Sequence, residues 1–92
     1  MKAVKAIVTV IGNDTVGIIA DVCAVLAKHG VNVLDISQTI LQGVFTMIML
    51  VDASECTVPF AELSDILREH GNEKELSIRI QREDIFNAMH RI

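Results

Sequence analysis

The spacing of apolar residues along the chain switches repeatedly between a strand-like and a helix-like pattern. Residues 3–11, 31–41 and 44–51 are short runs rich in β-branched side chains, and the first and third are apolar on both faces, which is typical of central strands. Gln42-Gly43, between the second and third runs, predicts a hairpin turn. In residues 75–82 apolar and polar positions alternate, which predicts a half-exposed strand at the edge of a sheet.

Two further segments have helical spacing. In residues 16–29 the apolar side chains form two adjacent rows, Ile18, Val22 and Val25 beside Ile19, Cys23 and Leu26. Asn13, Asp14 and Thr15 are good N-cap residues for this helix, and Gly30 is a good residue to end it. The second helix is expected from about Thr57, with Pro59 in its first turn and Gly71 at its end.

The order of these elements is β-α-β-β-α-β, two similar halves joined by a hairpin. Split βαβ units of this kind form a four-stranded antiparallel sheet with both helices on one face. We therefore expect an α+β, ferredoxin-like sandwich over residues 1–83, with spatial strand order 4-1-3-2 and strands two and four at the edges. Ninety-two residues leave room for one domain.

The last residues, 84–92, carry a stripe of large apolar side chains. Asp84 can cap a short helix, and Ile85, Phe86, Met89 and Ile92 would lie along one side of it. Because two helices cover one face of a sheet, the other face would expose aliphatic side chains of the first and third strands. We expect this C-terminal helical tail to dock on that face or on its counterpart in a second subunit.

Composition and charge narrow the possible partners. Hydrophobic residues make up 51% of the chain and aromatic residues 3%, so the core must be aliphatic, and some of the apolar surface is expected to be covered by another subunit. The net charge of −4, with scattered Lys and Arg, argues against binding to nucleic acid. No stretch approaches the ~20 apolar residues needed to span a bilayer, and no signal peptide is evident, so a cytoplasmic protein is expected.

Residues that could carry catalysis are few. His29, His70 and His90 each stand near the end of a helix or tail, where the helix dipole favours a cation, and none has a second His or a Cys at metal-ligand spacing. Cys23 and Cys56 are 33 positions apart, which excludes a CxxC redox pair and favours two buried thiols. The sequence therefore predicts no catalytic residue, no metal site, no cofactor and no enzymatic activity.

One short string favours a different class of protein. Residues 41–45, Leu-Gln-Gly-Val-Phe, resemble the acylphosphatase motif, and acylphosphatases are small α/β sandwiches of similar length. In that family the motif lies between the first strand and first helix with an Arg nearby, whereas here it falls at the central hairpin with no Arg following. An acylphosphatase-like hydrolase stays a remote alternative.

The loop of residues 12–18 offers groups suited to a zwitterionic ligand. The free N–H groups at a helix N-terminus can meet a carboxylate, and Asn13 and Asp14 have oxygens that could accept from an ammonium group. Gly17 removes a side chain that would block close approach. On the residues alone, the alternative that Asn13 or Asp14 merely caps the helix remains open.

The chain resembles the ACT domain family in the loop at residues 13–22 and in the stretch 26–36. The family pattern is an Asp-x-Pro-Gly loop, an aliphatic helix and then Gly-x-Asn-Ile, matched here by Asp14-Thr15-Val16-Gly17 and Gly30-Val31-Asn32-Val33. The similarity extends over residues 3–82, and the whole chain looks like the small stand-alone ACT proteins of bacteria and archaea, which are related to amino-acid-responsive regulators of the glycine cleavage system.

The resemblance implies a regulatory module that binds a small amino acid or similar metabolite, dimerises through its second strand and passes its output to an unidentified regulated protein. The residues expected at the ligand are Asn13, Asp14, Val16, Gly17, Ile18, Asn32, Val33 and Leu34, and the resemblance implies that Val33, Leu34 and Ile36 shape the interface. Val16 departs from the usual Pro, which leaves the loop less preorganised. A structural or protein-interaction module with an empty site is the second alternative.

Overall fold

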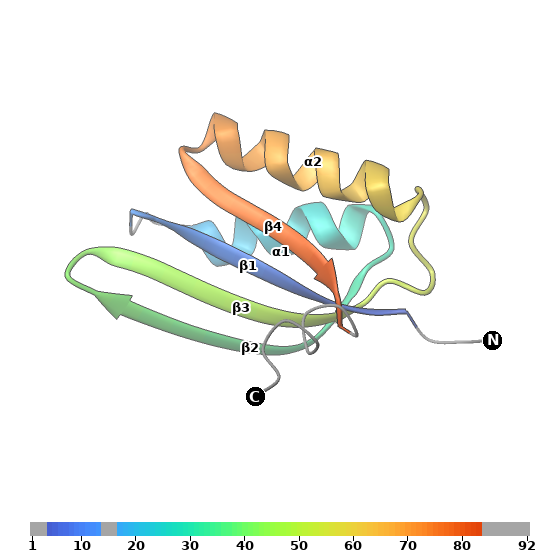
Figure 1. The fold of residues 1–92 in the computed structure, drawn as a ribbon, viewed down its shortest axis with the longest axis horizontal. Helices are drawn as coiled ribbons and strands as arrows, with labels where there is room; N and C mark the ends of the chain where they lie inside the picture. Colours follow the sequence, from blue (N-terminus) through green and yellow to red (C-terminus); the bar gives the residue numbers. More distant parts are fainter. Residues whose placement is uncertain (1–3, 14–16, 84–92) are drawn as a thin grey trace.

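In the computed structural model, which describes residues 4–13 and 17–83, the chain forms a four-stranded sheet and two helices (Figure 1). The strands are β1 (Lys5–Asn13), β2 (Asn32–Leu41), β3 (Val44–Asp52) and β4 (Leu76–Arg82), and the helices are α1 (Ile18–Lys28) and α2 (Phe60–Glu73). This is the predicted β-α-β-β-α-β order. The tail predicted for residues 84–92 lies outside the described residues.

All strand pairs are antiparallel, and the spatial order is β2-β3-β1-β4, which confirms the predicted 4-1-3-2 arrangement. The β2–β3 turn consists of Gln42 and Gly43, both with positive φ, as a two-residue hairpin turn requires. Near the start of β2 the pairing with β3 shifts between Val33 and Asp35, which marks a β-bulge at Leu34. β2 and β4 are thus the two edge strands.

The core lies between one face of the sheet and the two helices. It contains alternate residues of β1, β3 and β4 together with Ile18, Val22 and Leu26 of α1 and Leu63 and Leu67 of α2. In Figure 1, α2 runs alongside β4, and α1 lies behind the sheet. The other, open face carries Ile7, Ile11, Ile48 and Leu50, so β1 and β3 are apolar on both faces, as the sequence predicts.

The end of α1 is fixed by a glycine. His29 is the C-cap, and the N–H groups of Gly30 and Val31 donate to the carbonyls of Ala27 and Leu26, 3.0 and 2.9 Å away. This is the Schellman arrangement, and it requires the left-handed φ of +79° that Gly30 adopts. The prediction that Gly30 ends this helix is confirmed.

Three predicted boundaries were wrong. Gly12 and Asn13 do not stop the first strand, because both pair with β3 and Gly12 also pairs with Leu76 of β4. The second helix begins at Phe60, since Pro59 has extended backbone angles and is its N-cap. Gly71 does not stop this helix but lies inside it, where a Cβ would come 2.6 Å from the carbonyl oxygen of Leu76.

Candidate functional site

The first loop joins β1 to α1 at the hairpin end of the sheet. Asn13 is the last residue of β1, and Gly17, with φ of +87°, is the N-cap of α1. The first backbone hydrogen bond of the helix runs from the N–H of Asp21 to the carbonyl of Gly17, 2.9 Å. The N–H groups of Ile18, Ile19 and Ala20 therefore have no acceptor within the helix, which suits an anionic group.

The structure changes the role of two residues at this loop. Ile18 belongs to the hydrophobic core, with 6% of its surface exposed, so it can offer a ligand its backbone N–H but not its side chain. Gly17, which has no side chain, caps α1, so Asn13 is a strand residue and not the predicted helix cap. A Cβ on Gly17 would meet no atom within 4 Å, which leaves space for a ligand to approach. Asp14 and Val16 lie outside the described residues.

The other predicted site residues, Asn32, Val33 and Leu34, lie at the far end of the sheet. Asn13 pairs with Val44, which pairs with Leu41 at the end of β2, whereas Asn32 begins β2 and pairs with Asp52. Nine residues of strand at about 3.3 Å each put roughly 30 Å between Asn32 and Leu41. Within one chain, the predicted binding residues therefore form two separate groups.

The start of β2 has a polar setting on the open face of the sheet. Asn32 stands opposite Asp52, which in turn stands opposite Lys5 of β1. The Asp52 carboxylate accepts hydrogen bonds from the Ser54 hydroxyl at 2.7 Å and from the Ser54 N–H at 2.9 Å. These two bonds, with a smaller contribution from the charge of Lys5, hold the pKa of Asp52 below its usual value.

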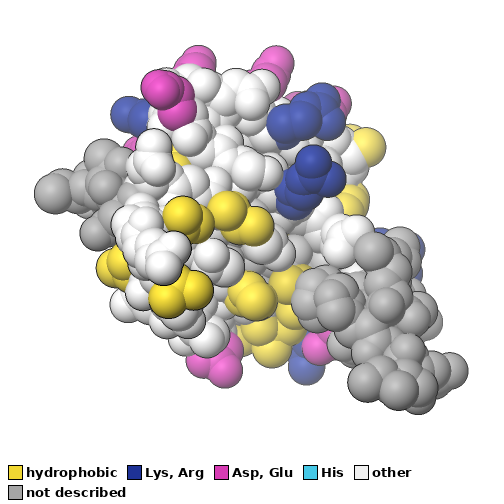
Figure 2. All heavy atoms as spheres, turned by 60° about the vertical axis from the view of Figure 1, so that its left-hand side comes forward, with side chains coloured by type: hydrophobic (Ala, Val, Ile, Leu, Met, Phe, Trp, Pro, Cys, Tyr) yellow, Lys and Arg dark blue, Asp and Glu magenta, His cyan; other side chains and the backbone are white. Residues whose placement is uncertain are grey.

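β2 exposes apolar side chains along the edge of the sheet. Ile36 and Ile40 face the helix layer, opposite Met49 and Phe45 of β3, yet the helices leave them 39% and 55% exposed. Leu34 and Leu41 are also exposed, Leu41 by 70%. Figure 2 shows hydrophobic side chains (yellow) exposed at several places on one face of the molecule. Such a row on an edge strand is typical of a surface that another polypeptide covers.

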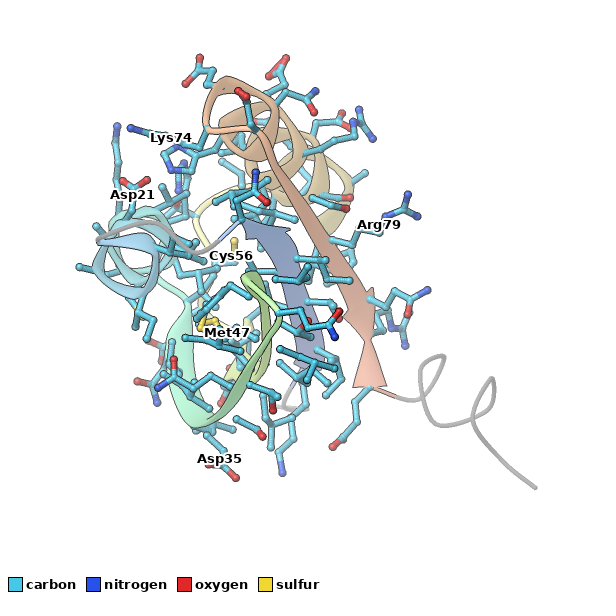
Figure 3. The ribbon with its side chains drawn as sticks, turned by 90° about the vertical axis from the view of Figure 1, so that its left-hand side faces the viewer. Asp21, Asp35, Met47, Cys56, Lys74 and Arg79 are labelled. Atoms are coloured by element: carbon cyan, nitrogen blue, oxygen red, sulfur yellow. The ribbon has the colours of Figure 1, made fainter. Side chains whose placement is uncertain are left out.

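Sequence reasoning missed a groove that borders the first turns of α1. It has a volume of about 500 Å³ and is lined by Gly17, Ile18, Ala20, Asp21, Ala24, Lys74 and Leu76. Figure 3 shows Asp21 and Lys74 on the same side of the molecule. An oxygen of Asp21 also lies 2.9 Å from Nε2 of His70, which ties α1 to α2. Asp21 and His70 are 49 positions apart, and no local pattern signals that they meet.

The remaining candidate residues of the described ranges occupy structural positions, and His90 lies outside those ranges. Nδ1 of His29 lies 2.8 Å from the carbonyl oxygen of Val25, one helical turn earlier. Cys23 and Cys56 are free thiols, half-buried against the hydrophobic core. The string Leu41–Phe45 forms the β2–β3 turn and the strand ends beside it. Within residues 4–13 and 17–83, no three His, Cys, Asp or Glu side chains are placed to hold a metal ion.

The fold and sequence together define an ACT domain. The family model for ACT domains matches residues 5–81, and the chain belongs to this family. Among curated relatives, a UPF0237 protein of Bifidobacterium longum is 53% identical, over 96% of this chain and 98% of its own length. A UPF0237 protein of the archaeon Methanopyrus kandleri is 47% identical over the same shares of the two chains.

Solved structures agree with this assignment. An ACT domain protein from Streptococcus pneumoniae superimposes with a TM-score of 0.82 at 40% identity, covering 97% of this chain and all of that one. A candidate glycine cleavage system transcriptional repressor has a TM-score of 0.77 at 22% identity, and this chain covers 47% of its length. At that identity the likeness shows the fold alone. Among the helices of the described residues, none is both long and apolar enough to cross a membrane.

Proposed function

We propose that this protein is a regulatory, non-catalytic module that binds an amino acid or similar small metabolite between two copies of the chain. The observation that carries the proposal is the separation of the predicted binding residues into two groups at opposite ends of the edge strand β2. Such a site is incomplete in one chain. It becomes complete when a second chain pairs with this edge.

Two copies that pair antiparallel through β2 are related by a two-fold axis near the middle of the strand, between Ile36 and Ser37. The start of β2 in one copy then lies beside the end of β2 in the other. Asn32 of one copy thus approaches Leu41 of the other, whose sheet continues through Val44 to Asn13 at the first loop. Three strand spacings, about 14 Å, therefore separate the backbone of Asn32 in one copy from the backbone of Asn13 in the other. Side chains and a small ligand can bridge this gap together.

The chemistry of the two groups suits a zwitterion. The N–H groups at the start of α1 can receive a carboxylate, and the polar side chains of Asn13 and Asp14 can accept from an ammonium group. Asn32 of the other copy adds an amide that both donates and accepts. The bulge at Leu34 breaks the regular ladder beside it, which is common next to binding sites.

The pairing surface can be tested apart from the ligand. Ile40 is an exposed residue of the β2 edge, and a Lys there should oppose strand pairing. We expect sedimentation to show a dimer for the native chain and a monomer for Ile40→Lys at micromolar concentration. Ile48→Lys is the matched control, because Ile48 is similarly exposed but lies on the open face of β3. A native monomer, or a dimeric Ile40→Lys, would contradict the proposed interface.

Ligand identity can be found with a thermal-shift screen of the twenty amino acids. A ligand present at 100 times its Kd stabilises the folded state by about 2.7 kcal/mol, a shift that is easily measured. Asp14→Ala should weaken binding of the hit more than it weakens the fold, since loss of a charge-assisted hydrogen bond costs about 1.5–3 kcal/mol, whereas the N-cap of α1 is Gly17 and not Asp14. If none of the twenty amino acids raises the melting temperature, the alternative of a structural or protein-interaction module with an empty site is favoured.

Mixing two variants tests whether the site is shared between subunits. Asp14→Ala and Asn32→Ala should each bind poorly alone. In a mixed dimer, the unmutated loop of one chain meets the unmutated strand of the other, so one of the two sites is intact. Half of a random mixture is mixed dimer, and calorimetry should therefore recover about a quarter of the native number of sites. No recovery would show that each site lies within one chain.

A further inference from the structure

The edge of the sheet opposite β2 is bordered by a long groove. It has a volume of about 690 Å³ and lies between α2, which contributes Ser64, Arg68 and Asn72, and β4, which contributes residues 76–81. This groove lies at the sheet edge opposite the proposed dimer edge β2. Its end at Leu76 is close to the first loop, because Leu76 pairs with Gly12 of β1. What binds along the groove does not depend on the ligand proposed above.

β4 has the properties of a strand that can accept another strand. It pairs with β1 over seven consecutive positions, from Ala6–Arg82 to Gly12–Leu76, with no shift in register. Leu76, Ile78 and Ile80 are buried, so the strand is firmly held. It contains no proline, and a regular edge strand presents outward-facing N–H and C=O groups that can pair with a further strand.

The helix side of the groove is a polar row. Ser64, Arg68 and Asn72 are spaced by four residues and therefore lie one above another along α2. A strand added beside β4 would place every second side chain toward this row and the others toward the open face. The hydroxyl, guanidinium and amide groups of this row would therefore contact the side chains on one face of an added strand.

The groove also carries cationic side chains on a chain whose net charge is −4. Arg79 lies at the middle of β4 and points away from the sheet in Figure 3. Nη2 of Arg68 contacts Asp65 at 2.7 Å, and this guanidinium has further N–H donors to offer. Glu75 also lines the groove, at the start of β4, and its carboxylate would repel an anionic partner. Such a partner should therefore bind near the arginines, away from that end of the groove.

We propose that this groove binds an extended acidic segment of a partner protein, which adds to β4 as a fifth strand. Consecutive residues of a strand point to opposite faces. A segment with two adjacent carboxylates therefore meets Arg79 on the open face and Arg68 on the helix face at the same time. Backbone pairing supplies affinity, and the two arginines select the charge of the partner.

A second copy of this chain is a poorer occupant of the same edge. Antiparallel pairing of two β4 strands about their midpoint would place Arg79 directly opposite its own copy, and like charges in that position are destabilising. The midpoint of β2 falls between Ile36 and Ser37, which carry no charge. The two edges of the sheet are thus suited to different partners, a second copy at β2 and an acidic strand at β4.

The test uses three synthetic octapeptides with the full-length protein. The first alternates valine and threonine around a central pair of glutamates, the second replaces the glutamates with lysines, and the third keeps the glutamates but has alternate backbone amides methylated. We expect the first to shift the amide NMR signals of β4 and to weaken at least tenfold between 0.05 and 0.5 M salt. The second and third should not shift them at the same concentration.

Charge variants show whether the arginines select the peptide. Arg79→Glu should weaken binding of the glutamate peptide at least tenfold and allow the lysine peptide to bind. Arg79→Gln and Lys28→Gln remove the same charge, but Lys28 ends α1 outside the groove, so only Arg79→Gln should weaken binding. Equal effects of these two variants would overturn the proposal. The proposal would also be overturned if the peptide shifted amide NMR signals of β2 but not of β4. The same holds if the β4 signals changed with protein concentration in the absence of peptide.

Discussion

At the scale of single residues, Gly30 shows how a backbone requirement and close packing act at one position. Its φ of +79° is needed to end α1, and a Cβ there would come 2.6 Å from the carbonyl oxygen of Glu55. The N–H of Thr57 donates a hydrogen bond to the backbone carbonyl oxygen of His29, 2.9 Å away, so the loop before α2 is held against the end of α1. The glycine thereby fixes both the helix end and the approach of the second half of the chain.

We predict that Gly30→Ala destabilises the protein by about 2–4 kcal/mol, since left-handed backbone at a non-glycine residue costs about 1–3 kcal/mol and the contact with Glu55 adds to it. Gly43→Ala is the matched control, because Gly43 has φ of +81° but open space where its Cβ would be. It should cost about 1 kcal/mol. Urea unfolding of both variants measures the difference, and equal losses would show that the Glu55 contact has no effect.

Asp52 gives a pH-dependent prediction at the same scale. Hydrogen bonds from Ser54 lower its pKa in the folded state, so its carboxylate contributes stability above the pKa of the unfolded chain, about 3.9. That contribution is lost as the pH falls through the lower pKa of the folded state. Ser54→Ala should therefore destabilise the protein at pH 7, and its difference from the native chain should vanish in acid. A difference that stays constant from pH 7 to pH 2 would contradict this account.

At the scale of elements, hydrophobic spacing predicted the six helices and strands of the described residues, and their β-α-β-β-α-β sequence predicted the strand order in the sheet. The boundaries that failed depend on contacts distant in sequence. Gly71 looks like a helix end, but it lets α2 pass close to the backbone of β4, where its missing side chain makes room for Leu76 and Ile78. Gly12 looks like a turn residue, but ladders on both sides continue the strand through it.

The candidate site was predictable to a lesser degree. The loop at Asn13 and Gly17 was found because its residue types suit a helix N-terminus and a ligand at once. The distance between that loop and Asn32 within one chain was not foreseen, because it follows from the register of two strand pairs, β1–β3 and β2–β3. The groove beside Asp21 was missed because Lys74 reaches it from the end of α2 and Leu76 from the start of β4, both distant in sequence from α1.

The contact between the side chains of Asp21 and His70, which links α1 to α2, can be tested by mutation. Both side chains are partly exposed, so the coupling should be modest, about 0.5–1 kcal/mol. A double-mutant cycle with Asp21→Asn and His70→Gln, followed by urea unfolding, measures it. Additive losses within error would mean that the 2.9 Å contact does not stabilise the packing of the two helices.

At the scale of the whole molecule, the sheet has one covered face and two edges with different chemistry. The β2 edge exposes apolar side chains and carries no charge at its midpoint, between Ile36 and Ser37, whereas the β4 edge has Arg79 at its midpoint. If two chains pair through β2, the combined sheet has a β4 strand at each outer edge. The two outer β4 edges are then the sheet edges that such a dimer leaves for a partner.

The last prediction concerns the open face of the sheet and the tail of residues 84–92. Ile11, Val44 and Ile48 are each more than 40% exposed on that face, so the apolar patch expected from the sequence is present on the described residues. The tail carries Ile85, Phe86, Met89 and Ile92, and our sequence prediction that it docks here as a short helix concerns residues outside the described part of the chain. β4, the edge strand that precedes these residues in the sequence, ends at Arg82, opposite Ala6 of β1.

Deleting residues 84–92 should therefore lower the melting temperature sharply or cause aggregation. Burial of Ile85 and Phe86 would contribute about 1.5–3 kcal/mol each, and 1 kcal/mol corresponds to about 4–8 °C in a domain of 60–100 residues. A loss of at least about 10 °C is expected by calorimetry. Phe86→Ala in the full-length chain should reproduce much of it, whereas Asn87→Ala, a polar neighbour, should not. A truncated chain that melts and stays dissolved like the native one would show that the open face needs no cover from the tail.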